Sequence, residues 1–484
     1  MLVDTDKPTM QNTWAAGMRT QREEVTDESL QVLGSFPSWL DGTLLVNGPG
    51  EFEAGDTELA HWFDALAMIR GFRIEGGSVR YTNRFVRSDD FRVAREEGCV
   101  RQSMPGTPAT GSALERLANT LSGGFQDNPS IGVVRLEETV YAVTESPVGI
   151  AIDPVTLETT GRRDLTDGLD ADATLGHTHV VDDVQWGLAT SFGRNPAYTL
   201  FQREDGDSPK AVTRLVFDDH PPYIHAFAVT DRYAVIPEAP FGVDFRELLL
   251  GTPGGKTFLN AFGPRDAPPR FHVVDRETGE RTAVVEADPF FIYHFANAYE
   301  SGDEIVVDCV AYDNPEAVTG LTIDRLRSDH PALPTGDFVR FRLPLSGGRA
   351  ERETLLAGPV EFPTVDYAGV NGRPYEFAYL AAIDRGSLPT AIAKVEVTTA
   401  TTWRWSQPGL HPGEPLFVPA PSADAEDDGV LLSVGLDARA DRSVLLCLDA
   451  ATLTERARAP LPHRLPFGFH GQFYDARRPR RSMH

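Results

Sequence analysis

Four histidines stand out because each lies among apolar, aromatic or glycine neighbours. His294 is near the middle of PFFIYHFANAYE, and His177, His225 and His470 lie in TLGHTHV, YIHAF and PFGFHG. A neutral imidazole has one donor and one acceptor nitrogen, so a buried ring needs partners for both. A single such histidine is more often a hydrogen-bonded core residue. Four in similar surroundings predict a metal site assembled from distant parts of the chain.

The spacing of these histidines excludes a local zinc knuckle, whose ligands lie a few residues apart. It favours a fold in which strands from different repeats meet on one axis. Imidazole is a ligand for zinc, copper, iron or nickel. Four neutral ligands would leave a divalent ion its full charge, and an octahedral iron would keep two positions for dioxygen and substrate.

Carboxylates in apolar strand contexts are candidates for holding these imidazoles. They are Glu145 in YAVTES, Glu361 in PVEFPTV and Asp337 in GDFVRF. A ligating histidine usually donates its second ring N–H to a carboxylate or a carbonyl, which fixes the ring. Each carboxylate alone is more often an ordinary residue at a strand edge. Together with four histidines, they predict an inner layer of ligands and an outer layer of acceptors.

The elements that would position these residues are mostly short strands. Segments such as GTLLVNGPG, IGVVRLEETVYAVTES, EIVVDCVAY and SVLLCLDA are rich in Val, Leu, Thr and aromatics, and turn residues bound them. The 43 glycines and 36 prolines suffice to separate many hairpins. Only residues 112–121 and 245–250 have a helical pattern.

A weak repeat recurs in IDPVTLETTG, VVDRETGERT and LDAATLTERA. Each is a strand that ends in Asp, then a turn, then Thr or Glu opening another strand. Such a unit is typical of a β-propeller blade, although similar turns occur in any β protein. About 450 residues divided by roughly 45 to 65 per blade give about seven to ten blades. We therefore predict an all-β propeller.

The charge of the chain excludes one class of partner. Its 71 acidic and 45 basic residues give a net charge of -26, which argues against binding to nucleic-acid phosphates. Lysine occurs only at positions 7, 210, 256 and 394, so nearly all basic residues are arginine. An acidic, lysine-poor chain with an ordinary core predicts a halophilic source, because salt screens its self-repulsion.

Cysteine content and hydropathy indicate an intracellular protein. Cys99, Cys309 and Cys447 are widely spaced and form no CxxC motif, so no disulfide framework or thiolate zinc site is indicated. The amino terminus is polar and lacks a signal-peptide pattern. No run of about 18 apolar residues could span a bilayer. We expect a soluble, cytoplasmic protein.

Eight motifs in order carry a family resemblance from about residue 42 to 473. They are NGPGEFEAG, HWFDALAMI, TLGHTHV, YIHAFAVTDRYAVIPEAP, PFFIYHFANAYE, VEFPTVDYAGVNGRPYEFAY, EPLFVPAPSADAEDDGV and PFGFHGQF. The chain resembles the carotenoid cleavage oxygenases. YAVTESPVGIAIDPVTLET is more similar to the animal-type branch, which includes β-carotene oxygenases and the retinal-pigment-epithelium isomerohydrolase.

The resemblance implies a seven-bladed propeller over residues 37–475, with an amino-terminal arm (1–36), a basic carboxyl-terminal tail (476–484) and a cap of loops and short helices over the substrate entrance. It also implies Fe(2+) on the axis and a catalytic centre made of the iron and its ligands. The residues that match the family's ligands are His177, His225, His294 and His470. The outer carboxylates match Glu145, Glu361 and Asp337, where Asp stands in place of Glu. His179 and His61 are not ligands by this resemblance.

The activity implied is oxidative cleavage of a conjugated C=C bond in a carotenoid or apocarotenoid, with O2 supplying both carbonyl oxygens. Thr144, Phe291, Phe295 and Phe469 are candidates for the wall of the substrate tunnel, although aromatics beside the ligands can equally be core residues. Their ring faces could stabilise positive charge on the polyene.

Two apolar segments, 112–125 and 245–262, fall where the family carries a patch that dips into the membrane. They predict peripheral contact with the inner face of a membrane, since the substrate resides in lipid. Packing against the protein body is an equal alternative, because interfacial helices are usually basic and these are not.

The most detailed prediction concerns the substrate and the double bond that is cleaved. An animal-type oxygenase in a halophilic microbe suggests β-carotene, cut at its central 15,15′ double bond to give retinal. An apocarotenoid is the nearest alternative. Alternatives from other classes are a metal-dependent propeller hydrolase, such as a lactonase, and a non-catalytic retinoid-binding protein.

Overall fold

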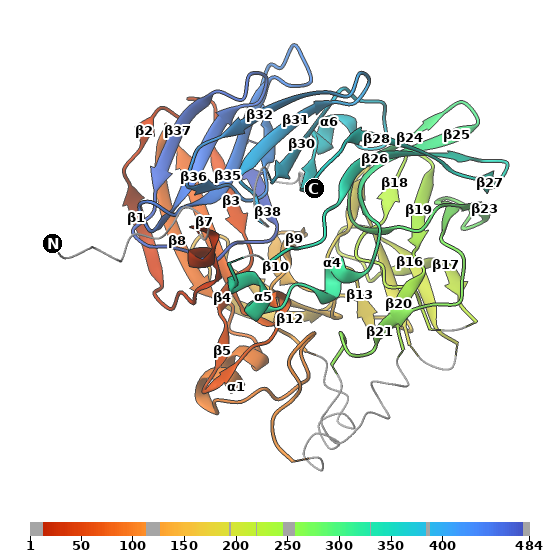
Figure 1. The fold of residues 1–484 in the computed structure, drawn as a ribbon, viewed down its shortest axis with the longest axis horizontal. Coiled ribbons are helices and arrows are strands. Elements are labelled where there is room, and N and C mark those ends of the chain that lie inside the picture. The colour runs from red at the N-terminus through yellow and green to blue at the C-terminus, as the bar shows by residue number, and fades with distance from the viewer. Residues whose placement is uncertain are drawn as a thin grey trace.

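Seven antiparallel sheets surround a common axis in the computed structural model. The structure describes residues 13–112, 126–192, 195–218, 220–244, 257–329, 331–383 and 388–477. Within these ranges, each of the seven sheets has four to six strands, and the sheets radiate as blades (Figure 1). The fold is therefore a seven-bladed β-propeller, which confirms the predicted class.

The first four blades follow one another along the chain. Blade one contains β1 (Val25–Leu30), β8 (Ser78–Phe85), β7 (Leu66–Glu75), β3 (Gly42–Val46), β4 (Pro49–Glu51) and β38 (Gly471–Asp475). Blade two contains β9 (Gly132–Leu136), β10 (Thr139–Val143), β11 (Val148–Ile152) and β12 (Thr159–Asp164). Blade three contains β13 (Ala173–Thr174), β14 (His179–Val181), β15 (Val184–Ser191), β16 (Ala197–Arg203) and β17 (Lys210–Val216). Blade four contains β18 (Ala228–Val229), β19 (Tyr233–Glu238), β22 (Arg270–Asp275), β23 (Arg281–Glu286) and β27 (Gly348–Arg349).

The remaining three blades complete the ring. Blade five contains β24 (Phe291–Ser301), β25 (Glu304–Tyr312), β26 (Asp337–Pro344) and β28 (Glu351–Leu356). Blade six contains β29 (Val360–Thr364), β30 (Phe377–Ala382), β31 (Ala391–Glu396) and β32 (Thr401–Ser406). Blade seven contains β33 (Leu410–His411), β34 (Leu416–Pro419), β35 (Gly429–Asp437), β36 (Arg442–Asp449), β37 (Glu455–Pro460) and β2 (Leu33–Gly34).

Short hairpins and helices lie outside the seven blades, and some of them carry residues of the main cavity, where a cap was predicted. The two small hairpins are β5 (Glu53–Ala54) with β6 (Thr57–Glu58), and β20 (Phe241–Val243) with β21 (Phe262–Pro264). The helices are η1 (Thr13–Met18), η2 (Trp62–Asp64), α1 (Asp89–Glu96), α4 (Glu316–Thr319), α5 (Ile323–Arg327) and α6 (Tyr367–Val370). The described helices are few and short, as the sequence predicts.

Both ends of the described chain are built into blades. The last strand, β38, pairs antiparallel with β3, so that Phe473 lies opposite Leu44 and the ring is closed across blade one. In Figure 1 these strands of opposite colour lie side by side. The residues predicted as an arm contribute β1 to the edge of blade one and β2 to the edge of blade seven.

The repeat noticed in the sequence closes the outer hairpins of three blades. Asp153, Asp275 and Asp449 each accept hydrogen bonds from backbone N–H groups two or three residues later. The residue four positions after each Asp has a positive φ: Leu157 at 58°, Gly279 at 71° and Leu453 at 55°. This Asx-type turn explains why the pattern recurs at the end of a strand.

Large aromatic rings fill the spaces between blades. Between blades four and five, the Phe271 ring lies 4.7 Å from that of Phe290 and 5.1 Å from that of Phe341, measured between ring centroids. All three side chains are buried. Since most sheets are covered on both faces, many strands are continuous apolar runs rather than alternating ones.

Candidate metal centre and adjoining cavity

The four histidines come from four different blades and reach one point on the axis. His177 precedes β14 in blade three, and His225 precedes β18 in blade four. His294 lies within β24 of blade five, and His470 directly precedes β38 of blade one. Contacts between β18, β24 and β29 and between β34, β38 and β9 place these strands around the axis. The distant spacing in the sequence is thus a consequence of the ring.

The arrangement of the ring nitrogens fits a bound metal ion. One nitrogen from each histidine lies within 4.8 Å of those of the other three. The ring centroid of His177 lies 4.5 to 5.2 Å from the other three centroids. Nε2 of His294 is buried and has no hydrogen-bond partner among the described residues. A buried nitrogen without a partner is costly unless a ligand satisfies it.

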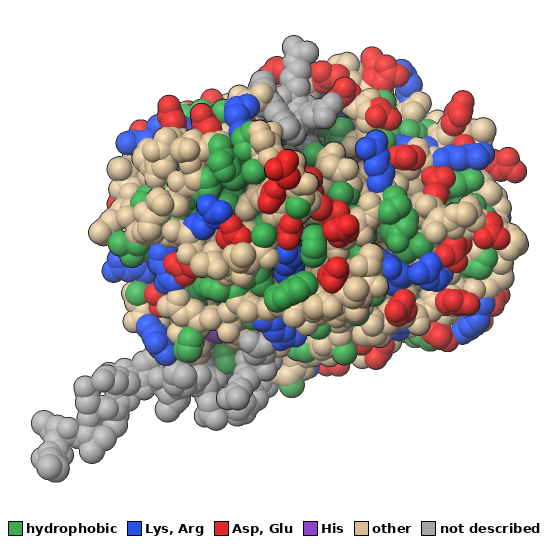
Figure 2. Space-filling view, turned by 90° about the horizontal axis from the view of Figure 1, so that it is seen from above, with side chains coloured by type: hydrophobic (Ala, Val, Ile, Leu, Met, Phe, Trp, Pro, Cys, Tyr) green, Lys and Arg blue, Asp and Glu red, His purple; other side chains and the backbone are tan. Residues whose placement is uncertain are grey.

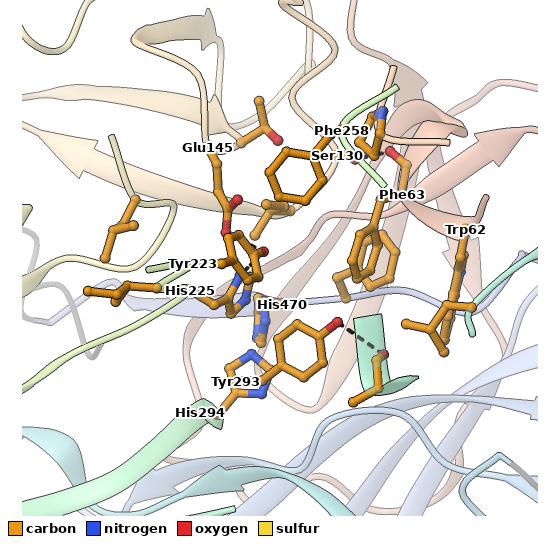
Figure 3. Close-up of a pocket in the computed structure, with 18 of the residues that line it drawn as sticks. Trp62, Phe63, Ser130, Glu145, Tyr223, His225, Phe258, Tyr293, His294 and His470 are labelled. Carbon is orange, nitrogen blue, oxygen red and sulfur yellow. Dashed lines mark hydrogen bonds and ion pairs between the residues drawn. The ribbon is translucent and has the colours of Figure 1, made fainter. Parts of the chain in front are cut away.

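Carboxylates fix three of the four imidazoles. Nδ1 of His225 contacts Glu145 Oε1 at 2.6 Å (Figure 3). Nδ1 of His294 contacts Glu361 Oε2 at 2.6 Å. In both pairs the carboxylate engages Nδ1, which leaves Nε2 available to a metal. Such hydrogen bonds set the tautomer and orientation of a ligating ring.

The third carboxylate is Glu414, so the prediction of Asp337 is wrong. Nδ1 of His470 contacts Glu414 Oε1 at 2.8 Å, and Glu414 Oε2 accepts from the Gly471 N–H at 2.8 Å. Asp337 opens β26 and accepts instead from the Gly358 N–H. The signal was present in the sequence, because Glu414 is the first residue of the motif EPLFVPAPSADAEDDGV.

All seven blades contribute one residue each to this cluster. Blades one, three, four and five supply the histidines, and blades two, six and seven supply Glu145, Glu361 and Glu414. Two tyrosines support the carboxylates: Tyr223 donates to Glu145 at 3.0 Å, and Tyr312 donates to Glu361 at 3.0 Å. The cluster is a polar network in which each carboxylate has more than one donor.

Burial favours the neutral form of two of these imidazoles, His177 and His294. Desolvation, and then the neighbouring histidines, lower the pKa of His177 and of His294 well below the usual 6.5. Burial also raises the pKa of Glu361 to about 7, against the hydrogen bonds that favour its charged form. Neutral imidazole is the form that binds metals, so His177 and His294 are in the binding form near neutral pH.

A cavity of about 710 Å³ lies directly over His225, His294 and His470. Its wall is mostly aromatic and aliphatic and includes Phe63, Tyr293 and Phe469. In Figure 3 the Tyr293 ring lies beside His294 and His470. The Phe63 ring packs 5.5 Å from that of Phe469, edge to face. The volume falls within the range of about 300–1,000 Å³ usual for small-molecule sites.

Two of the four predicted tunnel residues line this cavity and two do not. Thr144 and Phe469 are part of its wall. Phe291 lies behind the wall, with its ring centroid 4.7 Å from that of Tyr293. Phe295 faces a second, smaller cavity of about 140 Å³, which touches the ligands His177, His294 and His470. The prediction for Phe291 and Phe295 is therefore corrected.

Several aromatic wall residues were not predicted. They are Trp62, Phe63, Tyr223, Phe258, Tyr312 and Phe362. Phe362 is the most unusual, because its φ is 54°, a left-handed conformation that bulky residues rarely adopt. Its ring stacks on His294 at a centroid distance of 5.5 Å. Trp62 and Phe63 belong to the motif HWFDALAMI, whose aromatics the sequence analysis did not assign.

His61 and His179 have structural partners, as the resemblance implied for non-ligands. His61 Nε2 contacts the Val318 carbonyl at 3.0 Å, and its Nδ1 accepts from the Phe63 N–H. His179 contacts the Tyr367 hydroxyl and the Phe227 carbonyl, both at 2.8 Å. Both rings hold neighbouring segments together.

The apolar segments predicted to touch a membrane lie largely outside the described residues. Of 112–125 and 245–262, the structure describes Ser112 and residues 257–262. There, Phe258, Leu259 and Phe262 are partly buried and pack against the core of blades five and six. No described helix is long and apolar enough to cross a bilayer.

Comparison with known proteins places this geometry in a family. A family model described as Retinal pigment epithelial membrane protein matches residues 18–475. The chain belongs to the carotenoid cleavage oxygenase family. Proteins of this family depend on non-haem iron, and the four-histidine cluster fits that metal.

Relatives in this oxygenase family come from plants, insects and mammals. Carotenoid cleavage dioxygenase 8 homolog B of Oryza sativa is 34% identical over 478 residues, covering 93% of this chain and 83% of the relative. Carotenoid isomerooxygenase of Galleria mellonella is 32% identical, covering 95% and 96%. Beta,beta-carotene 15,15′-dioxygenase of Rattus norvegicus is 28% identical, covering 94% and 90%.

Solved structures of oxygenases agree with the fold along the whole chain. A variant of Synechocystis apocarotenoid oxygenase superposes with a TM-score of 0.85 at 26% identity, covering 97% of this chain and 99% of that one. The cobalt-substituted Synechocystis enzyme superposes with a TM-score of 0.83, with the same identity and coverage. This chain is therefore a carotenoid cleavage dioxygenase.

Proposed function

We propose that this dioxygenase holds Fe(2+) through His177, His225, His294 and His470 and cleaves one conjugated C=C bond of a polyene in the adjoining cavity. The observation that carries the proposal is the convergence of four imidazoles beneath an apolar cavity of about 710 Å³. When bound, the iron supplies the activation of dioxygen for scission of the double bond. The protein binds the polyene, orients it and excludes water.

The side chains of the wall have defined parts in this proposal. Phe63, Phe469 and Tyr293 form a rigid apolar surface next to the histidines. The Tyr293 hydroxyl donates to the Ala317 carbonyl at 3.1 Å, which fixes its ring 5.1 Å from that of His225. Ring faces near the reacting bond favour positive charge that develops on the polyene.

Two substrates are candidates. β-Carotene cut at its central double bond is the one predicted from the sequence, and the rat relative is named for that reaction. An apocarotenoid is favoured by polar side chains in part of the cavity wall, among them Ser146 and Asp172. The protein, loaded with iron under anaerobic conditions, should be mixed with each polyene and then with oxygen. Chromatographic sizing of the aldehydes would give the bond cut.

His294→Ala tests the metal site directly. We expect loss of bound iron and of all cleavage, because one of four ligands and its tie to Glu361 are removed, while circular dichroism shows the fold intact. His463→Gln is the matched control, since His463 contacts Tyr81 at 2.9 Å outside the cavity. Stoichiometric iron and turnover in His294→Ala would refute the assignment.

Peripheral membrane contact through 112–125 and 245–262 remains part of the proposal. Its support is chemical, because the substrate of a carotenoid oxygenase partitions into lipid. Flotation of the protein with phosphatidylcholine vesicles tests it, and recovery of all protein in the lipid-free fraction at both low and high salt would contradict it.

A further inference from the structure

The two ends of the main cavity differ in chemistry. One end is lined by the polar side chains of Ser146, Asp172, Thr174 and Thr190. They belong to blades two and three, at the end of β10 and along β13 and β15. The other end is lined mainly by aliphatic residues: Leu321, Leu333, Pro334, Ile383, Leu388 and Pro389. These lie in the connections of blades five and six.

The polar end and the apolar end of the cavity lie on opposite sides of the four histidines. In a ring of seven blades, blade three and blade six are three positions apart, which is nearly across the axis. The histidines occupy the axis between them. A rod-shaped ligand that crosses the cluster therefore has one end against blades two and three and the other against blades five and six.

Asp172 is held rigidly at the polar end. Its backbone N–H donates to the Thr190 carbonyl at 2.7 Å, and its Oδ2 accepts from the Phe192 N–H at 2.7 Å. The adjacent Ala173 pairs with Thr190 across β13 and β15. A carboxylate has about four acceptor positions, so one backbone donor leaves capacity for a ligand.

The neighbours of Asp172 also offer acceptors. The Thr174 hydroxyl donates to the Leu188 carbonyl at 3.0 Å, so its oxygen lone pairs face other partners. The Ser146 hydroxyl accepts from the Val148 N–H at 3.4 Å and donates to the Val148 carbonyl at 3.5 Å, so its hydrogen is already engaged. A wall of acceptors in a largely apolar cavity favours a ligand group that donates. It disfavours a hydrocarbon ring or an aldehyde, because neither offers a donor to the remaining acceptor positions of the Asp172 carboxylate.

We propose that Asp172, at the polar end of the cavity, binds a hydroxyl group at one end of the polyene, so that the substrate is a hydroxylated carotenoid or apocarotenoid. This inference rests on the proposed function and deepens it. The hydroxyl donates a hydrogen bond to the Asp172 carboxylate, while the opposite end of the polyene lies among the leucines and prolines of blades five and six. The position of the hydroxyl then sets which double bond lies over the histidines.

Anaerobic binding to two matched pairs of ligands tests the proposal without turnover. The pairs are zeaxanthin with β-carotene, and β-apo-8′-carotenol with β-apo-8′-carotenal. Quenching of tryptophan fluorescence gives the Kd, since Trp62 lines the cavity. We expect the hydroxylated member of at least one pair to bind about tenfold more tightly, as a hydrogen bond to a charged acceptor predicts.

Variants at Asp172 locate the effect. In Asp172→Leu the ratio of the two Kd values should fall to within about threefold of one, whereas Asp172→Asn, which keeps an acceptor oxygen, should retain part of the preference. Asp170→Leu is the matched control, because Asp170 is two residues away and its side chain is 90% exposed near Arg214. Melting curves and iron content confirm that each variant folds.

Two outcomes would overturn the inference. One is equal binding of both members in both pairs by the unaltered protein, and the other is a preference that survives in Asp172→Leu. Cleavage of the same four compounds in the presence of iron and oxygen is measured in parallel. Absence of cleavage of all four would count against the proposed function, whereas the binding ratios decide the role of Asp172 in either case.

Discussion

Three histidine–glutamate pairs fix the arrangement of the four-histidine cluster. Glu145, Glu361 and Glu414 each take the Nδ1 side of an imidazole, so the Nε2 atoms are directed at the axis. Without these contacts each ring could rotate about its side-chain torsions. The carboxylates therefore determine the direction of the ligands rather than binding the ion themselves.

Glu414→Gln should weaken metal binding by roughly 10- to 100-fold, as is usual when the hydrogen-bond acceptor behind a ligand is altered. The Kd for iron, measured by competition with a chelator, checks this. Asp337→Asn is the control and should leave the Kd unchanged, because Asp337 contacts the Gly358 backbone. The reverse result would restore Asp337 as the third acceptor.

The clustering of the four histidines was predicted correctly from their neighbours and motifs, but the third carboxylate was assigned to Asp337, although Glu414 opens one of the motifs. Asp337 opens β26, the third strand of blade five, and therefore lies radially outside β24 and β25. Glu414 comes just before β34, which contacts β38 close to the axis. Distance from the axis depends on the order of strands within a blade, and a strand-like sequence pattern does not contain that order.

At the scale of elements, strand β24 explains why the prediction that Phe291 and Phe295 line the cavity was wrong. Its pairing with β25 shifts register between Ile292 and Phe295 and again between Phe295 and Asn297. Such bulges break the alternation of a strand and are frequent near functional sites. His294 lies within the first of these shifts, so a simple period of two cannot say whether Phe291 or Phe295 shares its face.

The η2 turn couples a buried carboxylate to the cavity wall. Asp64 accepts from the Thr107 hydroxyl at 2.6 Å and from the Gly106 N–H at 2.9 Å. It also completes a capping box with His61, which sets the turn that carries Trp62 and Phe63. Burial raises the pKa of Asp64 to about 6, against these hydrogen bonds.

The raised pKa of Asp64 predicts a pH dependence of stability. A folded-state pKa above the unfolded value means that the folded protein binds the extra proton, so the stabilisation is complete below about pH 4 and is lost as the pH rises through 6. The free energy of unfolding of the protein minus that of Asp64→Asn should fall by up to about 3 kcal/mol over this range. Urea unfolding at several pH values checks this, and a flat or rising difference would contradict it.

At the scale of the whole molecule, the surface carries a large excess of negative charge. The net charge is -26, although acidic and basic side chains are interspersed on the face shown in Figure 2. Many arginines form ion pairs across strands, such as Arg80 with Asp27 and Arg456 with Asp449. Exposed pairs of this kind contribute little each, so the uncompensated charge dominates the response to salt.

The melting temperature should therefore rise when KCl increases from 0.1 M to 1 M. Screening shortens the Debye length from about 10 Å to about 3 Å and reduces repulsion between the excess carboxylates. Chloride salts are preferred over sulfate, because sulfate also strengthens apolar burial. A melting temperature that is constant or falls would count against the halophilic interpretation of the composition.

Propeller architecture was predictable from strand composition and the Asp-containing turns, whereas the number of blades from length alone was not. The number of strands per blade varies from four to six. Blades one and seven each contain a strand from the amino-terminal region, β1 and β2. A uniform length per blade therefore gives a range. The family resemblance predicted seven blades, because its motifs extend over nearly the whole chain.

Closure of the ring by β38 has a consequence for the order of events during synthesis. His177, His225 and His294 are translated before blades six and seven, but His470 reaches the axis only when β38 pairs with β3. A chain with an open ring offers at most three of the imidazoles in place. On the proposed metal assignment, we therefore expect firm retention of iron only after the last strand has docked.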